Sequence, residues 1–241
     1  MAPQPLSRVR PNAAVYATPD ALRMRPNLSC FVAEIIARWA YVEANLRTIL
    51  SYLLRAEAAP VAAMLNSISS ATAQMDMIGA AGRAKLHDPE LETFEAVLKI
   101  ARTAAKKRNA IAHHVWGITH DLPDALLLID PEAYSDLFVE IQEILANPHQ
   151  HQWVILQTDN ARTSVYREND FVELIDELSV VSRCTTFLIN YLNPQHAARD
   201  QMYRLLCSEP LIGAALSTLR NSRQPRPMPS PPDPQTESGS S

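Results

Sequence analysis

The clearest pattern along the chain is a set of apolar residues that recur at steps of three and four positions between residues 31 and 54. Such spacing places side chains on one face of a helix, so it predicts a long amphipathic helix that packs into a core. The residues of this set are Phe31, Ile35, Trp39, Val42, Leu46, Ile49 and Leu53.

Two more helices are predicted downstream. One follows Pro60 and is expected to end near Gly79 to Gly82, because glycine is typical of the C-terminal end of a helix. The next begins after Asp88-Pro89, a capping residue followed by a proline in the first turn. The residues expected to face inward are Leu65, Ile68, Met75 and Ile78 in the first helix, and Phe94, Val97, Leu98, Ala101 and Ala105 in the second.

Short apolar runs replace the helical pattern between about residues 117 and 168. The runs 125–130 (ALLLID), 153–158 (WVILQT) and 163–168 (TSVYRE) are typical of strands, and Asp159-Asn160 is typical of a hairpin turn between the last two. A helix is predicted between the first two runs, from the spacing of Tyr134, Leu137, Phe138, Ile141 and Leu145.

A long helix is predicted over 171–192, before Pro194, and a shorter one up to about Leu219. The fold class is therefore mainly α, a helical bundle with a small antiparallel β insertion (α+β). Residues 1–25 are Pro-rich and lack periodicity, which predicts a flexible arm. Residues 26–220 are expected to form one domain, and residues 221–241, rich in Pro and Ser, a disordered tail.

Composition narrows the class of protein. The net charge of −4 means that binding of a polyanion such as RNA requires a local basic patch. The three cysteines form no disulfide framework, the N-terminus has no signal-peptide pattern, and no apolar run approaches membrane-spanning length; these features favour a cytoplasmic protein without a membrane segment. His149 and His151 alternate, but no cluster of ligand residues accompanies them, so neither a metal site nor a cofactor is predicted.

The stretch 106–117, KKRNAIAHHVWG, places charged and polar residues at the predicted end of the third helix. On a wheel of about 100° per residue, Arg108 falls within the apolar arc of that helix. An arginine that faces a core needs a partner, and Glu43 at the edge of the first helix is the expected one. The opposite, polar arc carries Lys99, Arg102, Lys106, Asn109 and His113.

The string RNAIAHHVWG, together with RWAYVEANL in the first helix, resembles the HEPN superfamily (higher eukaryotes and prokaryotes nucleotide-binding domains). The resemblance covers about residues 28–192. Members are helical bundles, often homodimers, and include ribonucleases of toxin–antitoxin, phage-defence and RNA-processing systems. The resemblance implies an RNA substrate and a partner such as an antitoxin or a nucleotidyltransferase.

For this chain the resemblance implies metal-independent RNA cleavage by Arg108 and His113, helped by Asn109. Histidine can move the protons, and a guanidinium can stabilise the charge on the attacked phosphate. Because the histidine is doubled, His114 is an alternative to His113. Lys99, Arg102 and Lys106 would contact RNA phosphates, although a charged stripe is often only a solvated face. Two readings stay open: a ribonuclease, and a catalytically silent dimeric scaffold in which Arg108 and Glu43 merely fix helix packing.

Overall fold

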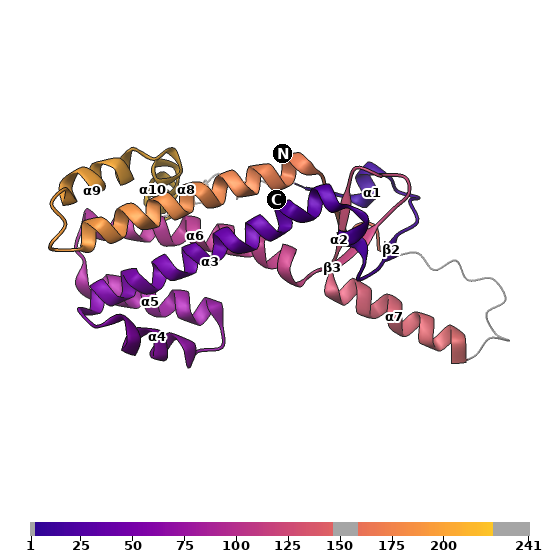
Figure 1. Ribbon diagram of the computed structural model, residues 1–241, viewed down its shortest axis with the longest axis horizontal. Coiled ribbons are helices and arrows are strands. Elements are labelled where there is room, and N and C mark those ends of the chain that lie inside the picture. The colour runs from indigo at the N-terminus through magenta and orange to yellow at the C-terminus, as the bar shows by residue number, and fades with distance from the viewer. Residues whose placement is uncertain (1–2, 147–158, 224–241) are drawn as a thin grey trace, which may run out of the picture.

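The computed structural model describes residues 3–146 and 159–223, which form an elongated helical body with a small sheet at one end (Figure 1). The mainly α fold with a small antiparallel sheet is confirmed. The helices are α1 (Leu6–Val9), α2 (Ala21–Met24), α3 (Pro26–Leu54), α4 (Ala58–Asn66), α5 (Ala71–Lys85), α6 (Glu90–His113), α7 (Pro131–Ala146), α8 (Glu168–Leu192), α9 (Arg199–Ser208) and α10 (Pro210–Arg223). The strands are β1 (Gln4–Pro5), β2 (Tyr16–Ala17), β3 (Val115–Ile118), β4 (Leu126–Ile129) and β5 (Thr163–Tyr166).

The long helices α3, α6 and α8 form the body, and α3 and α8 lie side by side along most of their length (Figure 1). The predicted apolar face of α3 is buried, and the helix begins at Pro26, five residues before the predicted pattern. It ends where Arg55 adopts a left-handed backbone with φ of 51°. The buried residues of α3 are Leu28, Val32, Ile35, Trp39, Val42, Leu46, Ile49, Leu50 and Leu53.

The segment around and after Pro60 forms two helices, α4 with Pro60 in its first turn and α5, so the prediction of a single helix is wrong. The serines between α4 and α5 explain the break, because the Ser70 side chain accepts a hydrogen bond from the backbone of Ala73 and starts a new helix. The expected end near Gly79 to Gly82 is also wrong, since α5 continues to Lys85. Both glycines are buried, and they serve close packing against α6 rather than termination.

The sheet has the order β1-β5-β4-β3-β2, with every pair antiparallel. The N-terminal segment supplies both edge strands, so the prediction of a flexible arm over residues 1–25 is wrong for the described part, residues 3–25. Leu6 and Ala21 in this segment are fully buried. Two-residue strands carry no periodicity of their own, which is why the pattern could not predict them.

Strand β4 is buried on both faces, which explains its uninterrupted apolar sequence. Leu126 and Leu128 belong to the main core of the bundle. Leu127 points to the other face and packs with Leu6 and Val165 in a second, smaller core that the N-terminal segment covers. The predicted strands at 125–130 and 163–168 are thus confirmed, whereas residues 153–158 lie outside the described residues.

The C-terminal part follows α8, which ends before Pro194 as predicted. The expected shorter helix is two helices, α9 and α10, separated at Glu209. Helix α10 continues to Arg223, slightly beyond the predicted domain boundary, and residues 224–241 of the predicted tail lie outside the described residues. Within the described residues no single helix is long and apolar enough to cross a membrane; α3 and α4 reach that composition only as a pair bent by 117°.

Candidate functional site at the end of helix α6

Helix α6 carries the motif to the junction between the bundle and the sheet. It starts at Glu90, and the negative charges of the acidic residues in its first turn interact favourably with the positive end of the helix dipole. It ends at His113, as predicted, and His114 adopts an extended backbone with ψ of 154°. Strand β3 then begins at Val115, so the two histidines lie where the helix becomes a strand.

Arg108 lies half-buried on the apolar side of α6, as its position on the helical wheel predicts. Its Cζ atom is 6.0 Å from the centroid of the Trp39 ring on α3, at the outer limit of a cation–π contact. One guanidinium nitrogen, Nη1, donates to Asn109 Oδ1 at 3.1 Å. The Nε atom is buried and has no hydrogen-bond partner.

The expected ion pair between Arg108 and Glu43 does not form among the described residues, so that prediction is wrong. Glu43 Oε1 accepts instead from Trp39 Nε1 at 2.7 Å. The indole is one turn away on the same helix and competes successfully for the carboxylate. Glu43 therefore supports the site indirectly, by fixing the ring beside which the guanidinium lies.

The two histidines have different surroundings. His113 is exposed at the last position of α6, on the polar side with Lys106 and Asn109. His114 is half-buried, and its Nδ1 atom is buried without a hydrogen-bond partner. The motif thus holds two unsatisfied buried nitrogens, Arg108 Nε and His114 Nδ1. Such atoms are uncommon in folded proteins and call for an explanation, such as strain, a functional role or a bound water or ion; Arg25 Nε, outside the motif, is another.

Part of the predicted basic stripe lines one groove. Lys99, Arg102 and Lys106 border a space of about 430 Å³ between α5, α6 and α10. Arg83 from α5 borders it too; no pattern in the sequence indicated this residue, because it lies on another helix. Arg102 is less available than predicted, since its Nη2 donates to Asp76 Oδ1 at 2.7 Å.

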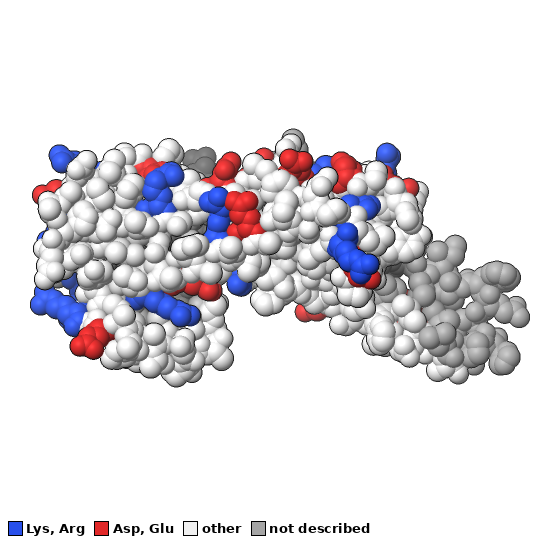
Figure 2. Space-filling model, viewed as in Figure 1, with Lys and Arg blue, Asp and Glu red and all other residues white. Residues whose placement is uncertain are grey.

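Acidic residues limit the basic character of the surroundings. Lys107 forms an ion pair with Glu177 of α8, and Glu95 lines the groove beside Lys99. On the face shown in Figure 2, lysine and arginine side chains alternate with acidic ones, so that face presents no continuous basic surface. Within the groove, the basic side chains without an acidic partner among the described residues are Arg83, Lys99 and Lys106.

The described residues contain no group of three or more histidine, cysteine or acidic side chains that could hold a metal ion. His149 and His151 lie outside the described residues. The polar side chains that the motif itself brings to the end of α6 are Arg108, Asn109, His113 and His114.

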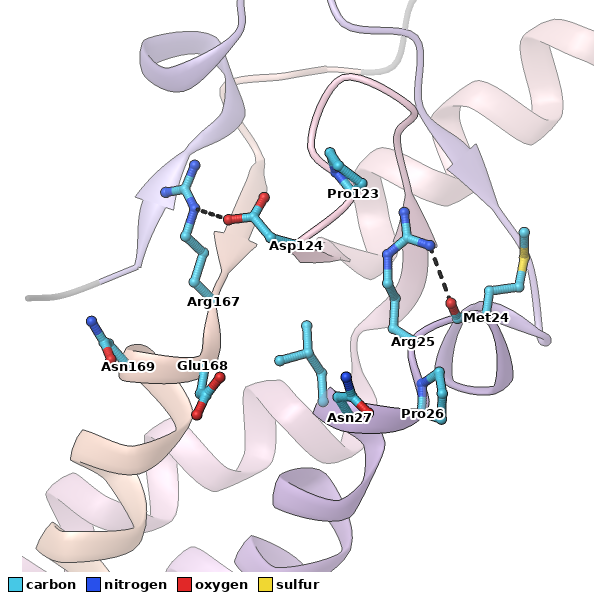
Figure 3. A pocket seen from close by; sticks show the side chains of 10 residues that line it. Met24, Arg25, Pro26, Asn27, Pro123, Asp124, Arg167, Glu168 and Asn169 are labelled. Carbon is cyan, nitrogen blue, oxygen red and sulfur yellow. Dashed lines mark hydrogen bonds and ion pairs between the residues drawn. The ribbon is translucent and has the colours of Figure 1, made fainter.

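A separate cavity of about 500 Å³ lies between the starts of α3 and α8 (Figure 3). No pattern in the sequence predicted this cavity. Arg25 and Arg167, which directly precede the two helices, stand on either side of it, and Asp124 binds Arg167 Nε at 3.2 Å. Glu168 also lines the space, so two carboxylates balance two guanidinium groups. The formal charges of these four side chains therefore cancel, although Arg25 Nε is buried without a hydrogen-bond partner.

Comparison of the chain with protein-family models, with curated proteins and with solved structures finds no match.

Proposed function

We propose that this chain is a HEPN-like protein that cleaves RNA without a metal ion at the end of α6, in the cytoplasm. The observation that carries the proposal is the pair of buried, unpartnered nitrogens, Arg108 Nε and His114 Nδ1, in a motif that also carries the exposed imidazole of His113. A phosphate would supply the acceptor that the guanidinium lacks. The biological setting that the resemblance implies is a toxin–antitoxin or defence system.

Cleavage proceeds by attack of the RNA's own 2′-hydroxyl on the neighbouring phosphorus, with the 5′-oxygen as the leaving group. His113 takes the proton from the hydroxyl or gives one to the leaving oxygen. Arg108 stabilises the negative charge that develops on the phosphate. Asn109 keeps the guanidinium in place through its side-chain oxygen, which leaves its amide nitrogen for a phosphate oxygen.

A homodimer completes the site in this proposal. One exposed histidine supplies one proton transfer well, whereas the reaction needs both a base and an acid. A second copy of the chain would provide the other imidazole. An antitoxin or a nucleotidyltransferase is the further partner that the HEPN resemblance implies.

The experiment is cleavage of a labelled single-stranded RNA in EDTA by wild type and by two histidine variants. His113→Ala should lower the rate by at least about 10²-fold, the usual effect of removing an acid–base group. His114→Ala should have a smaller effect, because this side chain is partly sheltered and lies after the end of the helix. If only His114→Ala abolishes cleavage, the catalytic histidine is His114, and the assignment of His113 is wrong.

The groove has its own test. Lys99→Gln combined with Lys106→Gln should weaken RNA binding and flatten its dependence on salt, since each lost phosphate contact removes about one unit of slope. Each of the two changes is also made singly and compared with Lys85→Gln, which removes one charge at an exposed lysine of α5 that does not line the groove. Single groove variants that behave like Lys85→Gln would contradict binding at the groove.

A silent scaffold is the second candidate. It is favoured by the contacts that Arg108 already makes, the hydrogen bond to Asn109 and the proximity to Trp39. In that case the motif stabilises α6 against α3, and the folded dimer leaves every RNA intact. Failure of wild type to cleave any RNA in EDTA would decide for the scaffold.

A further inference from the structure

The cavity between the starts of α3 and α8 has the dimensions of a small-molecule site (Figure 3). Its volume of about 500 Å³ lies in the range of most ligand pockets. Three separate segments line it, namely the junction of α2 and α3, the turn before β4 and the start of α8. The apolar part of the wall, which consists of Met24, Pro26, Leu28 and Pro123, suits an apolar body of modest size.

Arg25 carries the positive charge in the wall that no acidic side chain compensates. Arg167 is paired with Asp124 through its Nε atom at 3.2 Å, whereas Arg25 forms no ion pair among the described residues. Arg25 Nη1 donates to the carbonyl oxygen of Met24 at 3.1 Å. Its Nε is buried and, like Nη2, has no hydrogen-bond partner in the described part of the chain. Nε and Nη2 together form the edge of a guanidinium that binds both oxygens of one carboxylate.

The backbone of Arg25 is held on both sides, so the position of its side chain is well defined. The N–H of Arg25 donates to the carbonyl oxygen of Leu22 at 3.2 Å. Its own carbonyl oxygen accepts from the backbone of Leu28 and of Ser29, each at 3.0 Å. A donor that is already held in place loses little conformational entropy when it binds a ligand.

The two helix starts at the cavity differ in charge. The first turn of α3, a helix of 29 residues, contains no acidic residue, and no side chain caps it. The start of α8 carries Glu168 and Asp170, and Asp170 Oδ2 accepts from the backbone N–H of Arg167 at 2.8 Å. Because a helix start has a partial positive charge of about half a unit, the two acidic residues compensate α8 but nothing compensates α3. The carboxylate of Glu168 also points away from the two guanidinium groups (Figure 3).

We propose that this cavity binds a small organic acid, with one carboxylate on the free edge of Arg25 at the start of α3 and an apolar body against the apolar part of the wall. A singly charged group fits better than a doubly charged phosphate monoester, because Asp124 and Glu168 border the same space and repel additional negative charge. The size of the cavity favours a small molecule over a polymer such as RNA. This binding does not depend on the proposed nuclease.

Saturation-transfer NMR on the full chain tests the ligand class with three probes, hexanoate, hexanamide and hexyl phosphate. Hexanoate should bind most tightly. Hexanamide has nearly the same shape without the charge and should bind at least about 10-fold more weakly, since charge-assisted hydrogen bonds are roughly twice as strong as neutral ones. Equal binding of hexanoate and hexanamide, or tighter binding of hexyl phosphate, would overturn the proposal.

Two variants and a control test the site itself. Arg25→Gln should lower the affinity for hexanoate by at least about 10-fold, because the bidentate charged contact is lost. Arg23→Gln removes the same charge from an exposed arginine of α2 that does not line the cavity, and it should bind hexanoate like wild type. Asn27→Trp retains Arg25 but fills the cavity from an exposed position of α3, and it should abolish binding. The proposal is wrong if Asn27→Trp, or a folded Arg25→Gln protein, binds hexanoate with wild-type affinity.

RNA binding by the same proteins separates this site from the proposed nuclease. Arg25→Gln and Asn27→Trp should bind single-stranded RNA like wild type, and RNA should not displace hexanoate. Displacement of hexanoate by RNA would assign the cavity to the RNA path and overturn the proposal. A wild-type protein that binds hexanoate but cleaves no RNA would refute the nuclease and leave the cavity's ligand class in place.

Discussion

Replacement of Gly82 by alanine is a demanding test of the packing that positions α6. Gly82 is buried in α5 where this helix meets Phe94 of α6. A methyl group at Gly82 would lie 2.0 Å from Phe94 Cε1 and 2.5 Å from Cζ, far inside van der Waals contact. Phe94 is fully buried, so its ring has little room to move.

Two opposing effects determine how much Gly82→Ala changes the free energy of unfolding. Alanine favours a helix over glycine by about 1 kcal/mol. Overpacking of a filled core costs about 1–3 kcal/mol, and the upper end applies here because the contact is with a buried ring rather than with the end of a flexible chain. Gly82→Ala should therefore lower the free energy of unfolding by about 1–2 kcal/mol, or the Tm by a few degrees at about 2–4 °C per kcal/mol.

Urea unfolding measures this loss against two comparisons. Gly213→Ala in α10 is the control, since a methyl group there meets nothing within 4 Å and should stabilise by up to about 1 kcal/mol. Phe94→Leu combined with Gly82→Ala should recover part of the loss by opening space. If Gly82→Ala is as stable as wild type, the close packing of α5 on α6 is wrong.

Three further predictions concern individual side chains. Arg108→Ala should cost only about 0.5–2 kcal/mol in thermal unfolding, the range of a cation–π contact, because Glu43 is not its partner; a loss of about 3–5 kcal/mol would indicate a broken buried ion pair. Asp130→Ala should cost about 1 kcal/mol through loss of the α7 cap. Burial alone would raise the pKa of Asp130, but hydrogen bonds from the backbone and the charge of Arg162 outweigh it and lower the pKa below the usual 3.8. The ionised carboxylate of Asp130 therefore stabilises the folded protein above pH 3.8. This stabilisation is lost as the pH falls through the lowered pKa. The stability difference between wild type and Asp130→Ala should therefore shrink below about pH 4, and a constant difference would contradict the cap. Burial raises the pKa of Cys184 to about 12, so a thiol reagent at pH 8 should label Cys30 and Cys207 in the folded protein and Cys184 only after unfolding; rapid labelling of all three would contradict the packing of α8.

The sequence predicted the elements that carry their own periodicity. The apolar spacing of α3, α6 and α8 is sufficient to define them, because each helix buries one continuous face. Elements that depend on distant partners escaped prediction. Strands β1 and β2 exist only because β5 and β3 offer them hydrogen bonds. Gly82 was interpreted as the end of a helix, since sequence alone does not reveal that Phe94 lies against it.

In the candidate site, too, features that follow from one helix were predicted, and features that depend on contacts between helices were not. The position of Arg108 on the apolar side of α6 follows from helical geometry and was predicted. The partner of Arg108 was not predicted correctly. Trp39 and Arg108 compete for the carboxylate of Glu43, and which of them binds it depends on where the indole nitrogen points. Arg83 joins Lys99 in the groove only through the packing of α5 on α6. No pattern in the sequence links residues on separate helices in this way.

The chemical nature of the RNA ends tests the central claim most directly. Wild-type protein, incubated in EDTA with an end-labelled single-stranded RNA, should leave upstream fragments that end in a 2′,3′-cyclic phosphate, because the nucleophile is the neighbouring 2′-hydroxyl. The same ends should be absent with folded His113→Ala protein. Fragments that carry a free 3′-hydroxyl, or cleavage that persists at the wild-type rate without His113 and His114, would contradict a metal-independent site at the end of α6.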